Sequence, residues 1–239
     1  MASKATFLAA NERGHADHGW LKANHSFSFG GWHNPHRIHF GALRVLNDDT
    51  VAPGMGFSTH PHDNMEIITI PLSGSVKHRD SMGNEGVIPA GEVQVMSAGT
   101  GITHSELNGS QHDELKLFQI WIIPNQRNVE PRYDQFQIDS TTHHNAFAQL
   151  VGPKNSGAGT WIHQDAYIHI ASLEAGKSID YLTKNSANGI YIMAILGQLS
   201  VLENELNERD ALSVIDTETL TFTAKKNSQF LVLEVPMTF

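Results

Sequence analysis

Short apolar runs separated by turn-forming residues recur along most of this 239-residue chain. In the first half, such runs occupy residues 38–47, 65–72, 75–78, 93–96, 102–107 and 115–123. The polar segment Asn47-Asp48-Asp49 and the pair Ser73-Gly74 are typical of turns that end a strand. Because few segments repeat with the period of a helix, the pattern predicts an all-β barrel or sandwich.

The second half repeats this plan at residues 167–173, 189–196, 199–202, 210–215, 220–224 and 230–235. The segments IITIPLSGSV (67–76) and YIMAILGQLSV (191–201) share an apolar run, a glycine and a short strand. A repeated plan of this kind indicates two related β-barrels. The polar stretch 124–139 is the expected join, which divides the chain into an N-terminal barrel (1–130) and a C-terminal barrel (131–239).

The composition narrows the class of protein. Hydrophobic residues make up 40% and charged residues 17% of the chain, as in a soluble globular protein. The formal net charge is −9 with no cluster of Lys or Arg, so nucleic acid is not an expected partner. No signal peptide or membrane-spanning run is recognised, so a membrane is not expected either and a cytoplasmic location is the default. The oligomeric state stays open, and a monomer is compatible with the sequence.

The absence of cysteine leaves histidine and carboxylate as the strong metal ligands of this chain. Two pairs of such residues, His60 with His62 and His104 with Glu106, have the spacing i, i+2, which places both members on one face of a strand. Two such strands facing each other would bring three imidazoles and a carboxylate to one point. That ligand set suits divalent Fe, Mn, Co, Ni, Cu or Zn.

The distribution of histidine indicates which half of the chain carries this chemistry. Eleven of the 15 histidines lie at or before His112, and the later repeat lacks both ligand pairs. The metal site is therefore expected in the N-terminal barrel only. His15, His18 and His25 are expected to pack or to form hydrogen bonds and not to bind metal, because His25 alternates with Phe27 in an ordinary strand pattern.

The motifs of the first half resemble those of the pirin family of bicupins, and most of all its bacterial members with quercetin 2,3-dioxygenase activity. The segments that carry the resemblance are residues 13–29, 41–49, GFSTHPHDNMEI (56–67), DSMGNEGVIPAGEVQVMSAGTGITHSE (80–106) and FQIWIIP (118–124). The second half matches in plan only. The resemblance implies two tandem cupin (jelly-roll-like) β-barrels, with His60, His62, His104 and Glu106 as metal ligands.

One departure from the wider cupin pattern concerns Glu66 and Gln94. In most cupins a ligand glutamate follows the His-x-His pair within a few residues, and the last ligand histidine closely follows a Pro-x-Gly turn. Here Glu66 stands near the first place, and Gln94, a poor metal ligand, stands near the second. The ligand set is then completed by His104 and Glu106 from the next strand. Glu66 is expected beside the ligands.

The same resemblance implies a reaction. It is a metal-dependent dioxygenase reaction that opens the central ring of flavonols such as quercetin with O2 and releases carbon monoxide and a depside. The substrate would be a small aromatic enol, Glu106 would be the catalytic base, and iron(II) is the first choice of metal, with Mn, Ni, Co, Cu or Zn as alternatives. A pirin-like redox-sensing regulator that binds metal without turnover, another cupin reaction and a metal store are the alternative functions.

Overall fold

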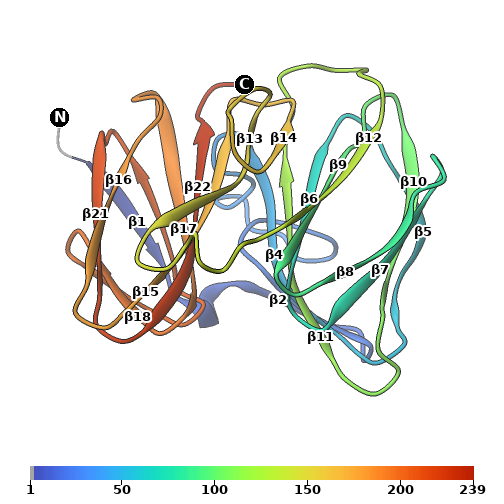
Figure 1. The fold of residues 1–239 in the computed structure, drawn as a ribbon, viewed down its shortest axis with the longest axis horizontal. Coiled ribbons are helices and arrows are strands. Elements are labelled where there is room, and N and C mark those ends of the chain that lie inside the picture. The colour runs from blue at the N-terminus through green and yellow to red at the C-terminus, as the bar shows by residue number, and fades with distance from the viewer. Residues whose placement is uncertain (1–2) are drawn as a thin grey trace.

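The computed structural model of this chain describes residues 3–239, which form two lobes side by side (Figure 1). Each lobe is built from a seven-stranded sheet and a four-stranded sheet. Within residues 3–239 the helical structure is a single 3-10 turn, η1 (Ala10–Glu12), and no helix is long and apolar enough to cross a membrane. The fold is therefore all-β, as predicted.

The N-terminal lobe contains the predicted ligand strands. Its large sheet has the spatial order β12 (Arg132–Gln137), β9 (Glu92–Ser97), β6 (Glu66–Ser73), β11 (Leu115–Ile122), β4 (Leu43–Val51), β3 (Leu21–His25) and β2 (Gly14–Asp17). Its small sheet has the order β5 (Gly56–His62), β10 (Ile102–Asn108), β7 (Ser75–Asp80) and β8 (Glu85–Pro89).

The C-terminal lobe repeats this arrangement. Its large sheet has the spatial order β1 (Lys4–Leu8), β20 (Ala211–Ile215), β17 (Asn188–Leu196), β22 (Ser228–Pro236), β15 (Tyr167–Leu173), β13 (Phe147–Pro153) and β14 (Thr160–Ile162). Its small sheet has the order β16 (Ser178–Leu182), β21 (Thr219–Ala224), β18 (Gln198–Val201) and β19 (Asn204–Asn207). The expectation of two tandem β-barrels is confirmed.

Two strands cross the predicted division of the chain at residue 130. The first strand, β1, pairs with β20 of the C-terminal lobe, with Lys4 opposite Ile215. Conversely, β12 lies beyond residue 130 but pairs with β9 of the N-terminal lobe. The limits 1–130 and 131–239 therefore stay a prediction, and the sheets are the better description of each lobe.

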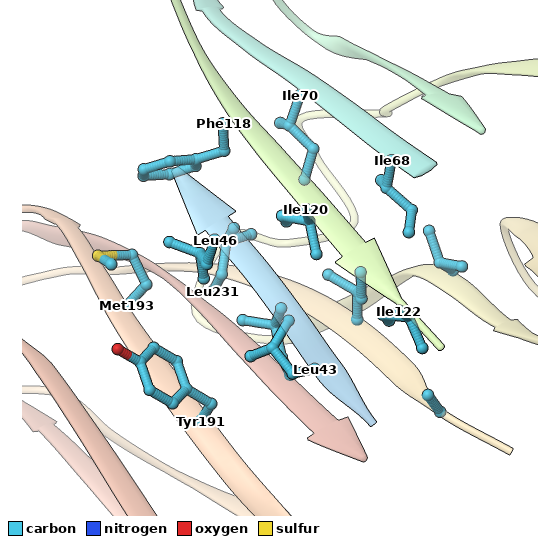
Figure 2. Close-up of a cluster of buried hydrophobic side chains, with 14 of the residues drawn as sticks. Leu43, Leu46, Ile68, Ile70, Phe118, Ile120, Ile122, Tyr191, Met193 and Leu231 are labelled. Atoms are coloured by element: carbon cyan, nitrogen blue, oxygen red, sulfur yellow. The ribbon is translucent and has the colours of Figure 1, made fainter. Parts of the chain in front are cut away.

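The two large sheets pack against each other through one hydrophobic cluster (Figure 2). The side chains of β4, β6 and β11 in the N-terminal lobe meet those of β17 and β22 in the C-terminal lobe; among them are Leu43, Leu46, Ile68, Ile70, Phe118, Ile120, Ile122, Tyr191, Met193 and Leu231. The opposite face of the N-terminal large sheet is turned toward its own small sheet. That inner face is the one that bears the site.

The interiors of the two barrels differ in polarity. In the C-terminal barrel, both sheets contribute to one continuous apolar cluster that includes Ile190, Phe222 and Val232. In the N-terminal barrel, the interior apolar residues fall into two separate clusters, one around Leu117 and one around Ile67. Polar side chains occupy the space between them, and these include the predicted ligand residues of β10.

Strand β4 differs from the strand predicted at residues 38–47. It begins at Leu43 and continues to Val51, so the segment Asn47-Asp48-Asp49, predicted to be a turn, is inside the strand. Asn47 and Asp49 face the barrel interior, and Asp48 faces the other lobe, where it forms ion pairs. Asp48 is tolerated because two arginines pair with it, and Asn47 because His25 lies within hydrogen-bond distance, whereas Asp49 faces the cavity without a partner of its own within residues 3–239.

Candidate metal centre

Strands β5 and β10 bring the predicted ligand pairs together. They are antiparallel neighbours, and His104 lies directly opposite His60. Along β10 the buried positions alternate with more exposed ones, so His104 and Glu106 both point into the barrel while Thr103 faces outward. The i, i+2 spacing therefore places His104 and Glu106 on one face of the strand, as the sequence predicts.

The three imidazoles meet at their Nε2 atoms. His104 Nε2 lies 3.1 Å from His60 Nε2 and 3.1 Å from His62 Nε2. His60 Nδ1 donates a 2.8 Å hydrogen bond to the Ser58 carbonyl, which leaves the lone pair on His60 Nε2. One proton bridges only one of these nitrogen pairs, whereas a cation accepts lone pairs from all three rings.

The two more enclosed rings are held in the neutral state. Burial lowers the pKa of His62 to about 4, and the neighbouring His104 and His60 rings add to this shift. Burial also lowers the pKa of His104 to about 3, with His60 and His78 as further causes. A neutral imidazole carries the lone pair that metal binding requires.

The spacing of the donor atoms fits a divalent first-row ion. Imidazole nitrogen binds such ions at about 2.1 Å, so two nitrogens at a right angle around one ion lie about 3 Å apart. The separations of 3.1 Å match this value. Within residues 3–239, the side-chain groups able to hold a metal all lie in the N-terminal barrel, as predicted.

The carboxylate of Glu106 is held by three neutral donors from the opposite sheet. Glu106 Oε1 accepts hydrogen bonds from Thr69 Oγ1 at 2.9 Å and from Gln94 Nε2 at 2.7 Å. Glu106 Oε2 accepts a 2.5 Å hydrogen bond from Gln119 Nε2. Hydrogen bonds to an ionised acceptor are stronger than neutral ones, so they fix the carboxylate in place.

Glu106 lies beside the three imidazoles, but its carboxylate is not part of the cluster formed by His60, His62 and His104. It belongs to a second buried group with His78 and His104, whose ligand atoms lie within 4.8 Å of one another. The structure therefore brings three of the predicted ligands, His60, His62 and His104, to one point. It places the fourth next to that point, within reach of the shared His104.

The donors to this carboxylate belong to a row of polar residues that crosses five strands of the large sheet. In this register His25 lies opposite Asn47, Asn47 opposite Gln119, Gln119 opposite Thr69, and Thr69 opposite Gln94. Except for Gln94, which stands near a ligand position of the wider cupin pattern, the row carries no recognisable motif. It forms because the register aligns five single polar positions.

His78 and Asp80 lie on the other side of β10, on β7. Strand register places Asp80 opposite His104 and His78 opposite Glu106. His78 Nε2 lies 3.3 Å from Asp80 Oδ2, and both side chains are fully buried. A carboxylate only accepts, so the proton stays on His78 Nε2, and His78 Nδ1 is left as an acceptor. The Nδ1 atoms of His78 and His104 are both buried without a partner within residues 3–239.

A cavity of about 380 Å³ opens beside the three imidazoles. Its aromatic lining includes Trp20, Phe29, Phe57 and Trp121, and Trp121 lies edge-to-face against His62 with ring centroids 5.0 Å apart. His18, His25, Asn47 and Asp49 line it as well. His18 and His25 are outside the metal group, as predicted, but their place in the cavity wall is not evident from the sequence.

The expectation that Glu66 lies beside the ligands is wrong. Glu66 precedes Ile67, which faces the barrel interior, so its own side chain is on the opposite face of β6. Its carboxylate accepts a 2.7 Å hydrogen bond from Ser97 Oγ, away from the imidazoles. Residues 63–65 separate β5 from β6, so the even spacing between His62 and Glu66 does not place the two side chains on one face of a strand.

A bicupin with converging histidines in its N-terminal barrel is the class of protein that this fold and site define. Residues 7–122 match the family described as Pirin, and residues 149–235 match the family described as Quercetinase C-terminal cupin domain. The chain belongs to the pirin family, which confirms the resemblance seen in its motifs.

Individual relatives agree with this assignment. The chain is 40% identical over 229 residues to the quercetin 2,3-dioxygenase of Escherichia coli (strain K12), covering 95% of this chain and 96% of that one. It is 38% identical over 222 residues to the pirin-like protein of Caulobacter vibrioides, covering 92% and 95%. The bacterial pirin YhhW from Escherichia coli, solved in complex with nickel(II), superposes with a TM-score of 0.92 at 36% identity over 98% and 99% of the two chains.

The nickel-bound relative and the histidine cluster together support a divalent metal site in this chain. The identity of the ion, the ligand roles of the four predicted residues and the base role of Glu106 stay predictions.

Proposed function

We propose that this chain is a metal-dependent dioxygenase that opens the central ring of flavonols such as quercetin and releases carbon monoxide and a depside. The observation that carries the proposal is the convergence of three imidazole Nε2 atoms at an aromatic-lined cavity, with a carboxylate alongside. The name of the Escherichia coli relative supports the same substrate class. One flavonol and one O2 give one depside and one carbon monoxide, so the reaction needs no external reductant.

In this proposal His60, His62 and His104 hold the metal, and Glu106 completes the ligand set. A divalent ion bound there supplies Lewis-acid stabilisation of the deprotonated enol and redox chemistry with O2. Iron(II) is our first choice, and Mn, Ni, Co, Cu and Zn are alternatives, because imidazole and carboxylate ligands accept several first-row ions.

Glu106 takes the proton of the substrate enol in this scheme. Its carboxylate lines the cavity and is oriented by Gln94, Thr69 and Gln119. A base held in position contributes about 10²–10⁴-fold to the rate of such a step. Because the three donors are neutral, they orient the carboxylate without neutralising its charge.

The cavity matches a flat aromatic substrate. Its volume of about 380 Å³ falls within the range of about 300–1,000 Å³ that is usual for small-molecule sites. Trp121 contacts Phe29 edge-to-face, with ring centroids 5.3 Å apart, and together they form an apolar wall beside His62. Such a wall excludes water from the reacting end of the substrate.

Aerobic turnover of quercetin tests this proposal. The protein is reconstituted separately with each of the six ions, and flavonol absorbance is followed together with carbon monoxide release, with His62→Ala as the control. We expect metal-dependent loss of absorbance matched by carbon monoxide. Bound metal without turnover of quercetin or other flavonols would overturn the enzymatic proposal in favour of a redox-sensing regulator.

A further inference from the structure

A second polar region of the cavity lies on strands β3 and β4, outside the metal group. His25, Asn47 and Asp49 all line the cavity there. His25 Nδ1 and Asn47 Oδ1 are 2.9 Å apart, so these two side chains satisfy each other in part. Neither the metal centre nor the proposed base uses any of the three residues.

Asp49 is the member of this region without a partner. Its side chain lies in the cavity wall with only 2% of the residue exposed, and within residues 3–239 its Oδ1 atom has no hydrogen-bond partner. Burial, together with the negative charges of Asp48 and Glu106, raises the pKa of Asp49 to about 8. A buried carboxyl group without a partner is destabilising unless a ligand completes its hydrogen bonds.

The position of Asp49 separates it from the reacting end of the cavity. Asn47 lies opposite Gln119, the residue that hydrogen-bonds Glu106, whereas Asp49 lies opposite Leu117. Two residues along a strand span about 7 Å, so Asp49 is one such step further along the barrel wall than Asn47. A rigid aromatic molecule that contacts Glu106 with one end has its other parts available for contact with this wall.

We propose that Asp49 binds a hydroxyl group of the substrate that is remote from the enol, and that the chain therefore prefers polyhydroxylated aromatic enols. This inference rests on the proposed function, whose substrate class it narrows. A hydroxyl group suits Asp49 in either protonation state, because it donates to a carboxylate and accepts from a carboxylic acid. An apolar ring edge at the same place would leave the carboxyl group unpaired, and sites built to bind a hydroxyl discriminate strongly against analogues that lack it.

Anaerobic titration of the metal-loaded protein with two flavonols tests the inference. Quercetin carries hydroxyl groups on both outer rings, whereas 3-hydroxyflavone carries the enol hydroxyl only, and absorbance changes report the Kd of each. We expect the wild-type protein to bind quercetin more tightly. The preference is the Kd for 3-hydroxyflavone divided by the Kd for quercetin. In Asp49→Leu this ratio should fall about tenfold, the loss expected for one hydrogen bond to a buried group. The control is Asp180→Leu, at an exposed position of strand β16.

The outcomes separate this inference from the proposed function. If wild-type protein binds neither flavonol, the proposed function fails and the inference with it. If it binds both but the Kd ratio is the same in Asp49→Leu, the inference is overturned while the proposed function stands. Metal content is measured in every variant, because loss of metal in Asp49→Leu would instead make Asp49 part of the metal centre. Should Asp49→Leu fail to fold, Asp49→Asn and Asp49→Ala give the same comparison, with the ratio expected to fall further in Asp49→Ala.

Discussion

Gln94 and Glu106 lie on opposite sheets of the N-terminal barrel, and Gln94 Nε2 donates a 2.7 Å hydrogen bond to Glu106 Oε1. Gln94 stands near the place where the wider cupin pattern has its last ligand histidine. In this chain that position orients a carboxylate. Gln94 also donates to Thr69 Oγ1 at 3.2 Å, so a single buried amide contacts both Glu106 and Thr69.

Gln94→Leu should therefore loosen Glu106 and destabilise the protein. The variant removes the Gln94 donor and leaves the buried carboxylate with fewer hydrogen bonds, which costs about 1.5–3 kcal/mol when the acceptor is charged. Urea unfolding measures this loss, and metal titration should show weaker binding in the same variant. Gln137→Leu on the exposed part of β12 is the matched control. Equal stability of the two variants would mean that the Gln94 bond contributes nothing.

The ligand spacing could be predicted from the sequence, but the surroundings of the ligands could not. His60, His62, His104 and Glu106 follow a period of two that a strand converts directly into a shared face. Thr69, Gln94 and Gln119 are single polar residues within apolar strands and carry no such signal. They meet at Glu106 only through the register of β6, β9 and β11, which is set by pairing over the whole sheet.

The misplaced strand end at Asn47-Asp48-Asp49 has a similar cause. Three consecutive polar residues usually indicate a turn. Here Asp48 Oδ2 pairs with Arg209 Nε at 3.2 Å and with Arg13 at 3.3 Å. Arg209 belongs to the C-terminal lobe and is distant in the sequence, so no local pattern reveals that Asp48 has partners. The two-barrel plan can be predicted from the sequence because the apolar runs repeat. The ion pair between the lobes cannot, because its two residues are far apart in the sequence.

His62→Ala and His104→Ala should each abolish metal binding and activity. Each substitution removes one of three nitrogen donors, and His104 is the ring that lies 3.1 Å from both others. Metal content after reconstitution and dialysis measures the effect. His36→Ala, at an exposed loop position, is the control and should keep its metal. Full metal occupancy in His104→Ala would place the ion elsewhere.

Glu106→Gln should retain more metal than activity. The amide keeps the shape of the side chain and one oxygen acceptor, but it is no longer a base. We expect the quercetin turnover number to fall by about 10²-fold or more, while metal content falls less. Parallel loss of both quantities would leave Glu106 as a ligand without a role in proton transfer.

His78→Phe should weaken metal binding without removing it. The phenyl ring keeps the stacking on Tyr133, whose ring centroid lies 4.6 Å from that of His78, but it removes the imidazole that lies 5.5 Å, centroid to centroid, from the His104 ring and that pairs with Asp80. Loss of a side chain that supports a ligand histidine from outside costs about 10- to 100-fold in metal affinity. Competition with a chelator measures this change, and His36→Phe is the exposed control. An unchanged affinity would show that His78 acts in packing only.

Glu66 should make the stability of the protein depend on pH. Burial raises the pKa of Glu66 from 4.5 to about 7, opposed by the hydrogen bond from Ser97. Because the folded pKa is the higher one, the folded state binds the proton more tightly than the unfolded state. The free energy of unfolding therefore decreases as the pH rises between about 4.5 and 7, by on the order of 3 kcal/mol, and the penalty is constant above that range.

Glu66→Gln removes this titration because the amide is neutral throughout, and Ser97 still has an oxygen to donate to. We expect Glu66→Gln to be more stable than the wild type at pH 8, with the difference shrinking steadily as the pH falls to 5. Urea unfolding of the metal-free proteins at several pH values measures it, which avoids the separate pH dependence of metal binding. Glu203→Gln, at an exposed turn, should follow the wild-type curve. A difference between Glu66→Gln and the wild type that does not change with pH would show that Glu66 is already ionised in the folded protein at pH 5.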